Sequence, residues 1–150
     1  MTVSTIDGTL ESVSVKRKAS KLWRMENLSF RKADGSEEPF PGIMVVTPEV
    51  GAQLQPGAAG RFYLYKSIDH RGLHAVRLAD STVLMKFPAT NENLMAVLFV
   101  INLAVLIGLM VVEGRPYLLT IALVPFTGVL YFLYRRTRVQ AEAQVAADNP

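Results

Sequence analysis

The chain has 150 residues, half of them hydrophobic, with a formal net charge of +3 and no cysteine. The absence of cysteine excludes a cysteine nucleophile and is compatible with a reducing compartment. The small net charge provides little of the electrostatic attraction that dominates nucleic-acid binding.

The first part of the chain has the pattern of a small β-domain. Short segments rich in Val, Tyr, Phe and Thr alternate with turns such as "LQPGAAG" and "DHRG", which contain the Gly, Pro and Asp that tight turns require. A domain with as few strands as this segment can hold suits a small closed or half-open barrel better than a two-sheet sandwich. We expect a mainly β, OB-like barrel over residues 1–92, with strands at 9–15, 21–30, 43–47, 61–67, 73–78 and 82–87 and a short helical turn within 48–55.

The order of these segments resembles a membrane-anchored OB-like domain of the bacterial NfeD-like kind. The resemblance is carried by a long second strand ending "NLSFRKADG", then by "LQPG" before the strand "RFYLYKS", and covers residues 6–88. It implies the fold alone. In that family the membrane segments usually precede the barrel, whereas here they follow it.

Few residues suggest catalysis or metal binding. "DHRGLH" brings Asp69, His70 and His74 close in sequence, but it lies at a turn between strands and no third or fourth ligand is evident. A phosphate-binding loop and a nucleophile elbow are both missing. We therefore expect no enzyme activity, no cofactor, no metal and two ordinary surface histidines.

Two features of the barrel suggest binding. Alternation in "RFYLYK" sends Phe62 and Leu64 to one face and Arg61, Tyr63 and Tyr65 to the other, where aromatics beside a cation form a possible binding face. A basic cluster, which could meet nucleic acid or anionic lipid headgroups, lies in one loop and strand start. Its members are Lys16, Arg17, Lys18, Lys21 and Arg24.

The last third of the chain predicts a transmembrane helical hairpin over residues 93–135. The runs 94–112 and 117–134 contain no charged residue, and each would be about 27 to 29 Å long as a helix, close to the thickness of a bilayer core. The turn 113–116 between them forces the helices to be antiparallel. A membrane anchor of aromatic and basic residues ends the second run. By the positive-inside rule, these basic residues place both termini in the cytoplasm, including a tail at 136–150. The anchor residues are Tyr131, Tyr134, Arg135, Arg136 and Arg138.

Four residues are expected to pack the helices. Asn102 lies at the depth of Thr127, so its amide could find a hydrogen-bond partner within the hairpin. Ala104 and Gly108 form a small-xxx-small pair about 160° around the helix from Asn102. This second face predicts a further helix partner, in a homo-oligomer or a larger membrane-protein complex; lipid contact is the alternative.

Two functional hypotheses follow. The favoured one is a non-enzymatic scaffold or accessory subunit of a bacterial inner membrane whose cytoplasmic barrel docks a protein partner. The alternative is a membrane-tethered module that recruits nucleic acid or a small ligand, although nucleic acid is not the expected partner because the charge is low.

Overall fold

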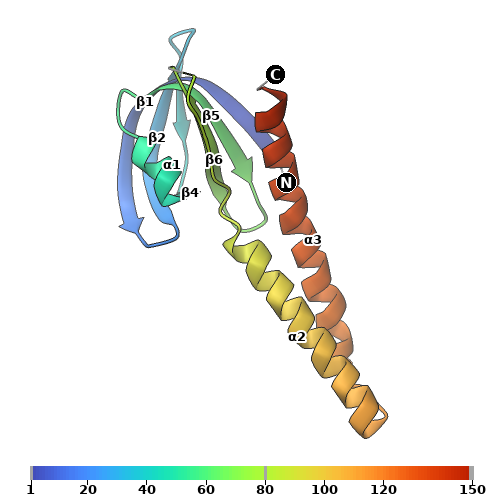
Figure 1. Cartoon of the computed structure of the whole chain (residues 1–150). Helices are drawn as coiled ribbons and strands as arrows, with labels where there is room; N and C mark the ends of the chain where they lie inside the picture. The colour runs from blue at the N-terminus through green and yellow to red at the C-terminus, as the bar shows by residue number, and fades with distance from the viewer. Residues whose placement is uncertain (1, 80, 149–150) are drawn as a thin grey trace. The chain divides into compact units, whose positions relative to one another are not determined.

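The computed structural model describes residues 2–79 and 81–148 and contains a β-domain followed by two long helices (Figure 1). It divides into two compact units, one made of the residues up to 88 with those from 139 onward, the other of residues 89–138. The described elements are β1 (Thr2–Lys18), β2 (Trp23–Lys32), β3 (Glu37–Phe40), β4 (Met44–Val46), α1 (Pro48–Gln53), β5 (Ala59–Lys66), β6 (Arg71–Leu78), β7 (Val83–Met85), α2 (Thr90–Glu113) and α3 (Leu118–Ala147).

Five strands close the barrel. β1 pairs with β2, β2 with β4, β4 with β6, β6 with β5 and β5 with β1, so the circuit returns to its start. Only the β4–β6 pair in this circuit is parallel, and α1 lies in the chain between β4 and β5. The predicted small, OB-like barrel followed by a helical hairpin is confirmed.

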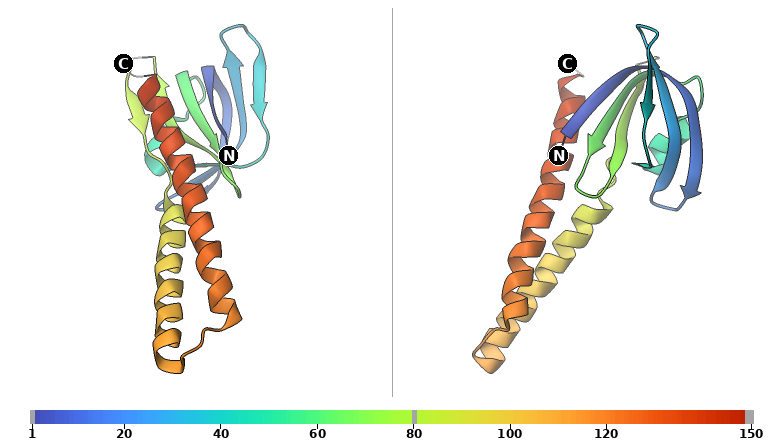
Figure 2. Two further views of the ribbon diagram at one scale, coloured as in Figure 1. Left: turned by 90° about the vertical axis from the view of Figure 1, so that its right-hand side faces the viewer. Right: turned by 180° about the vertical axis from the view of Figure 1, so that it is seen from behind.

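The remaining strands are additions to the barrel. β3 pairs with β2 alone and β7 with β6 alone among the described pairings. Figure 2 shows the β2–β3 hairpin, in blue and cyan, extending beyond the barrel strands.

Strand β1 closes the barrel because it pairs with different neighbours along its length. Thr2–Thr9 pair with β5, and Gly8–Lys18 pair with β2. At the crossover, Gly8 faces Gly60, and a Cβ at either position would lie within 2.2 Å of a carbonyl oxygen of the other adjacent strand. Glycine is therefore required where the strands approach this closely.

The barrel core is formed by the inward-facing residues of these strands. The rings of Phe30 and Phe62 lie 4.9 Å apart between centroids, and both side chains are fully buried with Leu10 and Met44. The predicted alternation in β5 is confirmed for its inward-facing positions, since Phe62 and Leu64 belong to the core.

Helices α2 and α3 form an antiparallel hairpin, and both are long and apolar enough to cross a membrane. Gly114, with φ of 69°, ends α2 in the left-handed conformation typical of helix ends. Many of their large apolar side chains are exposed, including Val100 at 62% and Leu118 at 84%. An apolar surface of this kind is stable when lipid covers it.

The predicted elements differ most from the observed ones in three places. β1 begins at Thr2 and not at residue 9, β3 was not predicted, and α3 continues to Ala147 through most of the segment expected as a tail. The short helix expected within 48–55 is observed as α1.

Candidate functional site

The face predicted from "RFYLYK" is covered by the chain's own helix. Tyr63 is fully buried, because the last turns of α3 pack on it, and Tyr65 is 2% exposed, with the ring of Phe87 4.7 Å from its own between centroids. Val145 belongs to a small apolar cluster with Tyr63 and Ala75, against which Val83 packs. These tyrosines therefore pack within the domain and do not present their rings to solvent.

Polar contacts hold the end of α3 on this face. Arg61 donates to both carboxylate oxygens of Asp7, at 2.5 and 2.9 Å, and to Asp148 at 2.9 Å. Arg77 donates to the backbone carbonyl of Asp148 at 2.6 Å. The hydrogen bond and charge of Arg61 lower the pKa of the Asp148 carboxyl, and Asp7 and Asp148 raise the pKa of Arg61. Thus Arg61 joins strand β1 to the end of the helix.

The two histidines differ in environment. His74 is fully buried, and its Nε2 donates to the carbonyl of Ala141 on α3 at 3.1 Å, whereas its Nδ1 has no hydrogen-bond partner among the described residues. Burial lowers the pKa of His74 to about 4, although the Ala141 carbonyl acts in the opposite direction. The expectation of two surface histidines is thus wrong for His74. The neutral ring contributes to holding α3.

His70 belongs to a short hydrogen-bonded chain. Its Nδ1 lies 2.8 Å from Asp69 and its Nε2 lies 3.0 Å from the hydroxyl of Tyr65. Tyr65 lies across Gly72, where a Cβ would be 2.4 Å from its ring. Burial raises the pKa of the Tyr65 hydroxyl. Within the residues that the structure describes, no three His, Asp or Glu side chains converge as a metal site would require.

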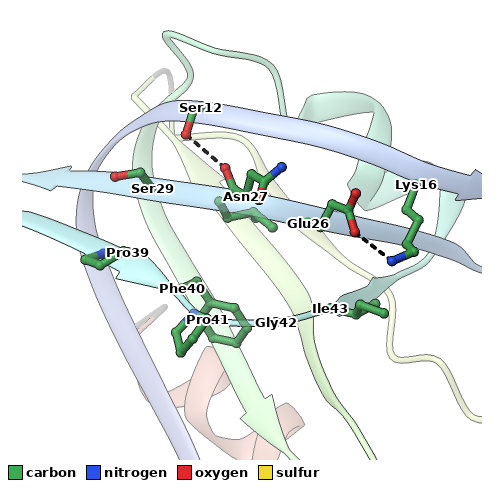
Figure 3. Close-up of a pocket in the computed structure, with 11 residues that line it drawn as sticks. Ser12, Lys16, Glu26, Asn27, Ser29, Pro39, Phe40, Pro41, Gly42 and Ile43 are labelled. Atoms are coloured by element: carbon green, nitrogen blue, oxygen red, sulfur yellow. Dashed lines mark hydrogen bonds and ion pairs between the residues drawn. The ribbon is translucent and has the colours of Figure 1, made fainter.

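An open groove of about 550 Å³ lies on another side of the barrel (Figure 3). It forms because β2 pairs with β3 only at Leu28–Arg31 and with β4 only at Trp23–Met25. Between these two pairings, Glu26 and Asn27 have β1 on one edge but no described strand on the other edge of β2. The chain that connects β3 to β4, "PGI" at residues 41–43, passes around this gap and forms one wall.

A β-bulge shapes the floor of the groove. Asn27 has φ of 56°, a left-handed conformation that asparagine tolerates better than most residues. Its carbonyl accepts a hydrogen bond from the Ser12 hydroxyl at 2.9 Å, and its side-chain amide donates to Ser14 at 3.1 Å. The ion pair between Lys16 and Glu26, at 2.9 Å, lies at one end.

The lining of the groove combines polar and apolar groups. Ser12, Asn27 and Ser29 provide hydroxyl and amide groups, and the opposite wall is apolar. Ile43 on that wall is 41% exposed. The apolar wall consists of Pro39, Phe40, Pro41, Gly42 and Ile43. Sequence reasoning missed this groove, and the only local signal was the clustering of Pro and Gly around an aromatic residue.

The helix-packing residues occupy two sides of the hairpin. Ala104 and Gly108 are exposed, and a Cβ on Gly108 would meet no atom within 4 Å. The close approach between the helices is instead at Gly128, where a Cβ would lie 3.1 Å from the ring of Phe99. Gly128 was not predicted as a packing residue. The face of Gly108 is thus open in the single chain.

The register of the hairpin agrees with the depth assigned to Asn102. Phe99 lies against Gly128, and Glu92 pairs with Arg138 at 3.3 Å. These contacts place Asn102 near the level of Thr127. The Thr127 hydroxyl donates to the carbonyl of Leu123 in its own helix at 2.8 Å, so the bond between Asn102 and Thr127 stays a prediction.

The anchor residues make contacts along α3. Arg135 donates to the Tyr131 hydroxyl at 2.7 Å and lies 5.9 Å from the centre of its ring. Arg138 pairs with the nearly buried Glu92 in the first turn of α2, where an acidic residue also interacts favourably with the helix dipole. Tyr134 is half-buried and Arg136 is exposed.

No protein-family model matches this chain, and no curated protein or solved structure is detectably similar to it.

Proposed function

We propose that this chain is a non-enzymatic adaptor of a bacterial inner membrane, whose cytoplasmic barrel docks an extended segment of a protein partner. The groove between Ser12 and the 39–43 wall is the observation that carries this proposal.

The membrane part of the proposal rests on α2 and α3. Their apolar side chains are exposed over lengths that span a bilayer core. Three arginines follow the apolar part of α3, whereas Glu113 and Arg115 roughly balance each other in the turn. By the positive-inside rule the barrel is then on the cytoplasmic side.

The groove has the features that an extended peptide requires. Its volume of about 550 Å³ is within the usual range of ligand sites. The gap in the pairing of β2 at Glu26 and Asn27 leaves room beside the strand, although the carbonyls of both residues already accept hydrogen bonds from Ser14 and Ser12. An extended peptide in the groove would bind mainly through side chains that pack on the apolar wall. Phe40 and Ile43 supply the apolar contact, and Ser29 supplies a hydroxyl.

The alternative, recruitment of nucleic acid or a small ligand, has less support. Both tyrosines of the aromatic face on which it depended are buried, and Arg61 is engaged by two carboxylates. Binding of single strands requires accessible aromatic rings and a positive groove.

Photo-crosslinking in intact cells tests the proposal. A benzophenone amino acid is placed at Ile43, in the groove, and as a matched control at Ile68, an isoleucine that is 54% exposed in the β5–β6 loop. We expect a discrete protein adduct from position 43 and none from position 68. Ser12→Trp, which fills the groove, should abolish the adduct without changing the amount of membrane-bound protein.

Two results would contradict the proposal. One is the same adduct pattern from both positions, because contact would then be unrelated to the groove. The other is an adduct from position 43 that survives Ser12→Trp.

A further inference from the structure

We infer that the tip of the β1–β2 hairpin, residues 15–26, binds the anionic headgroups of the membrane in which the helices are anchored. This inference rests on the membrane anchoring in the proposed function, but not on the peptide groove.

Positive charge is concentrated at this tip. Five of the sixteen basic residues and one of the thirteen acidic residues lie between positions 15 and 26, so the tip has about four net positive charges. The rest of the chain has one net negative charge. The only acid of the segment, Glu26, pairs with Lys16 at 2.9 Å. In the described part of the chain, no salt bridge joins Arg17, Lys21 or Arg24 to an acid.

The pairing of β1 with β2 places two of these cations at directly opposite positions. Arg17 on β1 is directly opposite Arg24 on β2, and both side chains are exposed. Like charges at opposite positions of a strand pair destabilise the pair. An anion between the two guanidinium groups would remove this repulsion, and phosphate, like carboxylate, is an anion that arginine binds in bidentate geometry.

Protection of a strand edge does not account for all of the cluster. The part of β1 beyond Thr9 pairs with β2 alone, and lysines on such an edge discourage pairing with another strand. This explains Lys16 and Lys18. It does not explain Lys21, which lies in the turn, or Arg24, which lies on β2 between β1 and β4.

A lipid surface fits the tip better than a nucleic acid. Only four residues, 86–89, connect β7 to α2, so a short connection joins the β-domain to the apolar helices. The cytoplasmic leaflet of a bilayer attracts basic segments near its surface.

The one aromatic side chain at the tip, Trp23, is not free to stack on bases. Its ring packs against Gly51 of α1, and Lys18 Nζ lies 4.5 Å from its centre.

The same tryptophan provides the test, because it is the only one in the chain. The full chain is reconstituted into nanodiscs of phosphatidylcholine alone or mixed with phosphatidylglycerol, each with a headgroup spin label that quenches nearby fluorescence. We expect quenching of Trp23 to be about twofold or more stronger in the anionic discs, and to fall to the neutral value at high salt because salt screens exposed charges. Co-elution with the discs reports insertion separately.

Matched charge reversals identify the surface. Arg17→Glu with Lys21→Glu should remove the additional quenching in anionic discs. Lys32→Glu with Lys66→Glu, which changes the net charge equally at exposed or half-exposed sites away from the tip, should retain it. Circular dichroism confirms that each variant keeps its barrel.

Equal quenching in neutral and anionic discs, for protein that co-elutes with both, would overturn the inference. So would an additional quenching that both charge-reversal pairs remove equally. A salt-dependent change of Trp23 fluorescence on adding a single-stranded oligonucleotide, without any effect of anionic lipid, would assign the tip to nucleic acid instead.

Discussion

Acidification should release the end of α3 from the barrel through protonation of His74. The ring is fully buried among Tyr63, Tyr65 and Phe87, and its Nε2 is bonded to the Ala141 carbonyl. The folded state lowers the pKa of His74 from its ordinary value of 6.5 to about 4. A charge on this ring would have no acidic partner among the groups it contacts.

The sign and size of the effect follow from proton linkage. Because the unfolded chain binds a proton more tightly, stability is fully present above about pH 6.5 and is lost as the pH falls toward 4. A pKa shift of this size lowers the free energy of unfolding by about 3 kcal/mol between about pH 6.5 and 4. About 2 kcal/mol of this is lost by about pH 5. Below about pH 4, His74 contributes no further loss.

The assay compares wild type with His74→Gln, whose amide can still donate to Ala141 but does not titrate. Urea unfolding of the full chain in detergent, followed by Trp23 fluorescence, gives the free energy of unfolding at neutral pH and near pH 5. We expect the wild type to lose about 2 kcal/mol more than the variant between these conditions. Equal losses in the two proteins would refute the assignment of the buried neutral ring.

Four further substitutions test the packing. Val145→Asp should destabilise the β-domain by about 2 to 4 kcal/mol in the same unfolding assay, because it buries a carboxylate in an apolar contact. Gly72→Ala should cost about 1 to 3 kcal/mol, since its Cβ must displace the ring of Tyr65; an unchanged free energy of unfolding would show that the ring moves freely. Gly128→Leu should separate the two helices, which a disulfide between cysteines introduced on facing helices would report. Gly108→Leu should leave that disulfide intact and instead reduce the size of the detergent-solubilised complex, and an unchanged complex would show that its face contacts only lipid.

The sequence predicted the barrel and the helices because both depend on local patterns. Apolar runs of spanning length indicate helices in a membrane, and alternation in "RFYLYK" indicates a strand with two faces. β3 was missed because "EEPF" is short, charged and contains proline, which is typical of edge strands and weak as a signal.

The packing of α3 on the barrel could not be predicted because it joins residues far apart in the chain. Arg61 and Asp148 are 87 positions apart, and His74 and Ala141 are 67 apart. A partial signal existed, since Ala141 and Val145 are four residues apart within a segment of strong helix formers. Nothing in the sequence, however, indicated that this face would cover Tyr63.

The arrangement across the membrane is the central claim, and labelling of single cysteines tests it most directly. The chain has no cysteine, so one introduced at Ser36, in the β2–β3 turn, or at Gly114, between the helices, is the only reactive thiol. In intact spheroplasts a membrane-impermeant maleimide should label the cysteine at position 114 and reach the cysteine at position 36 only after lysis. Labelling of position 36 in intact spheroplasts, or protection of position 114 until lysis, would contradict a cytoplasmic barrel anchored by a transmembrane hairpin.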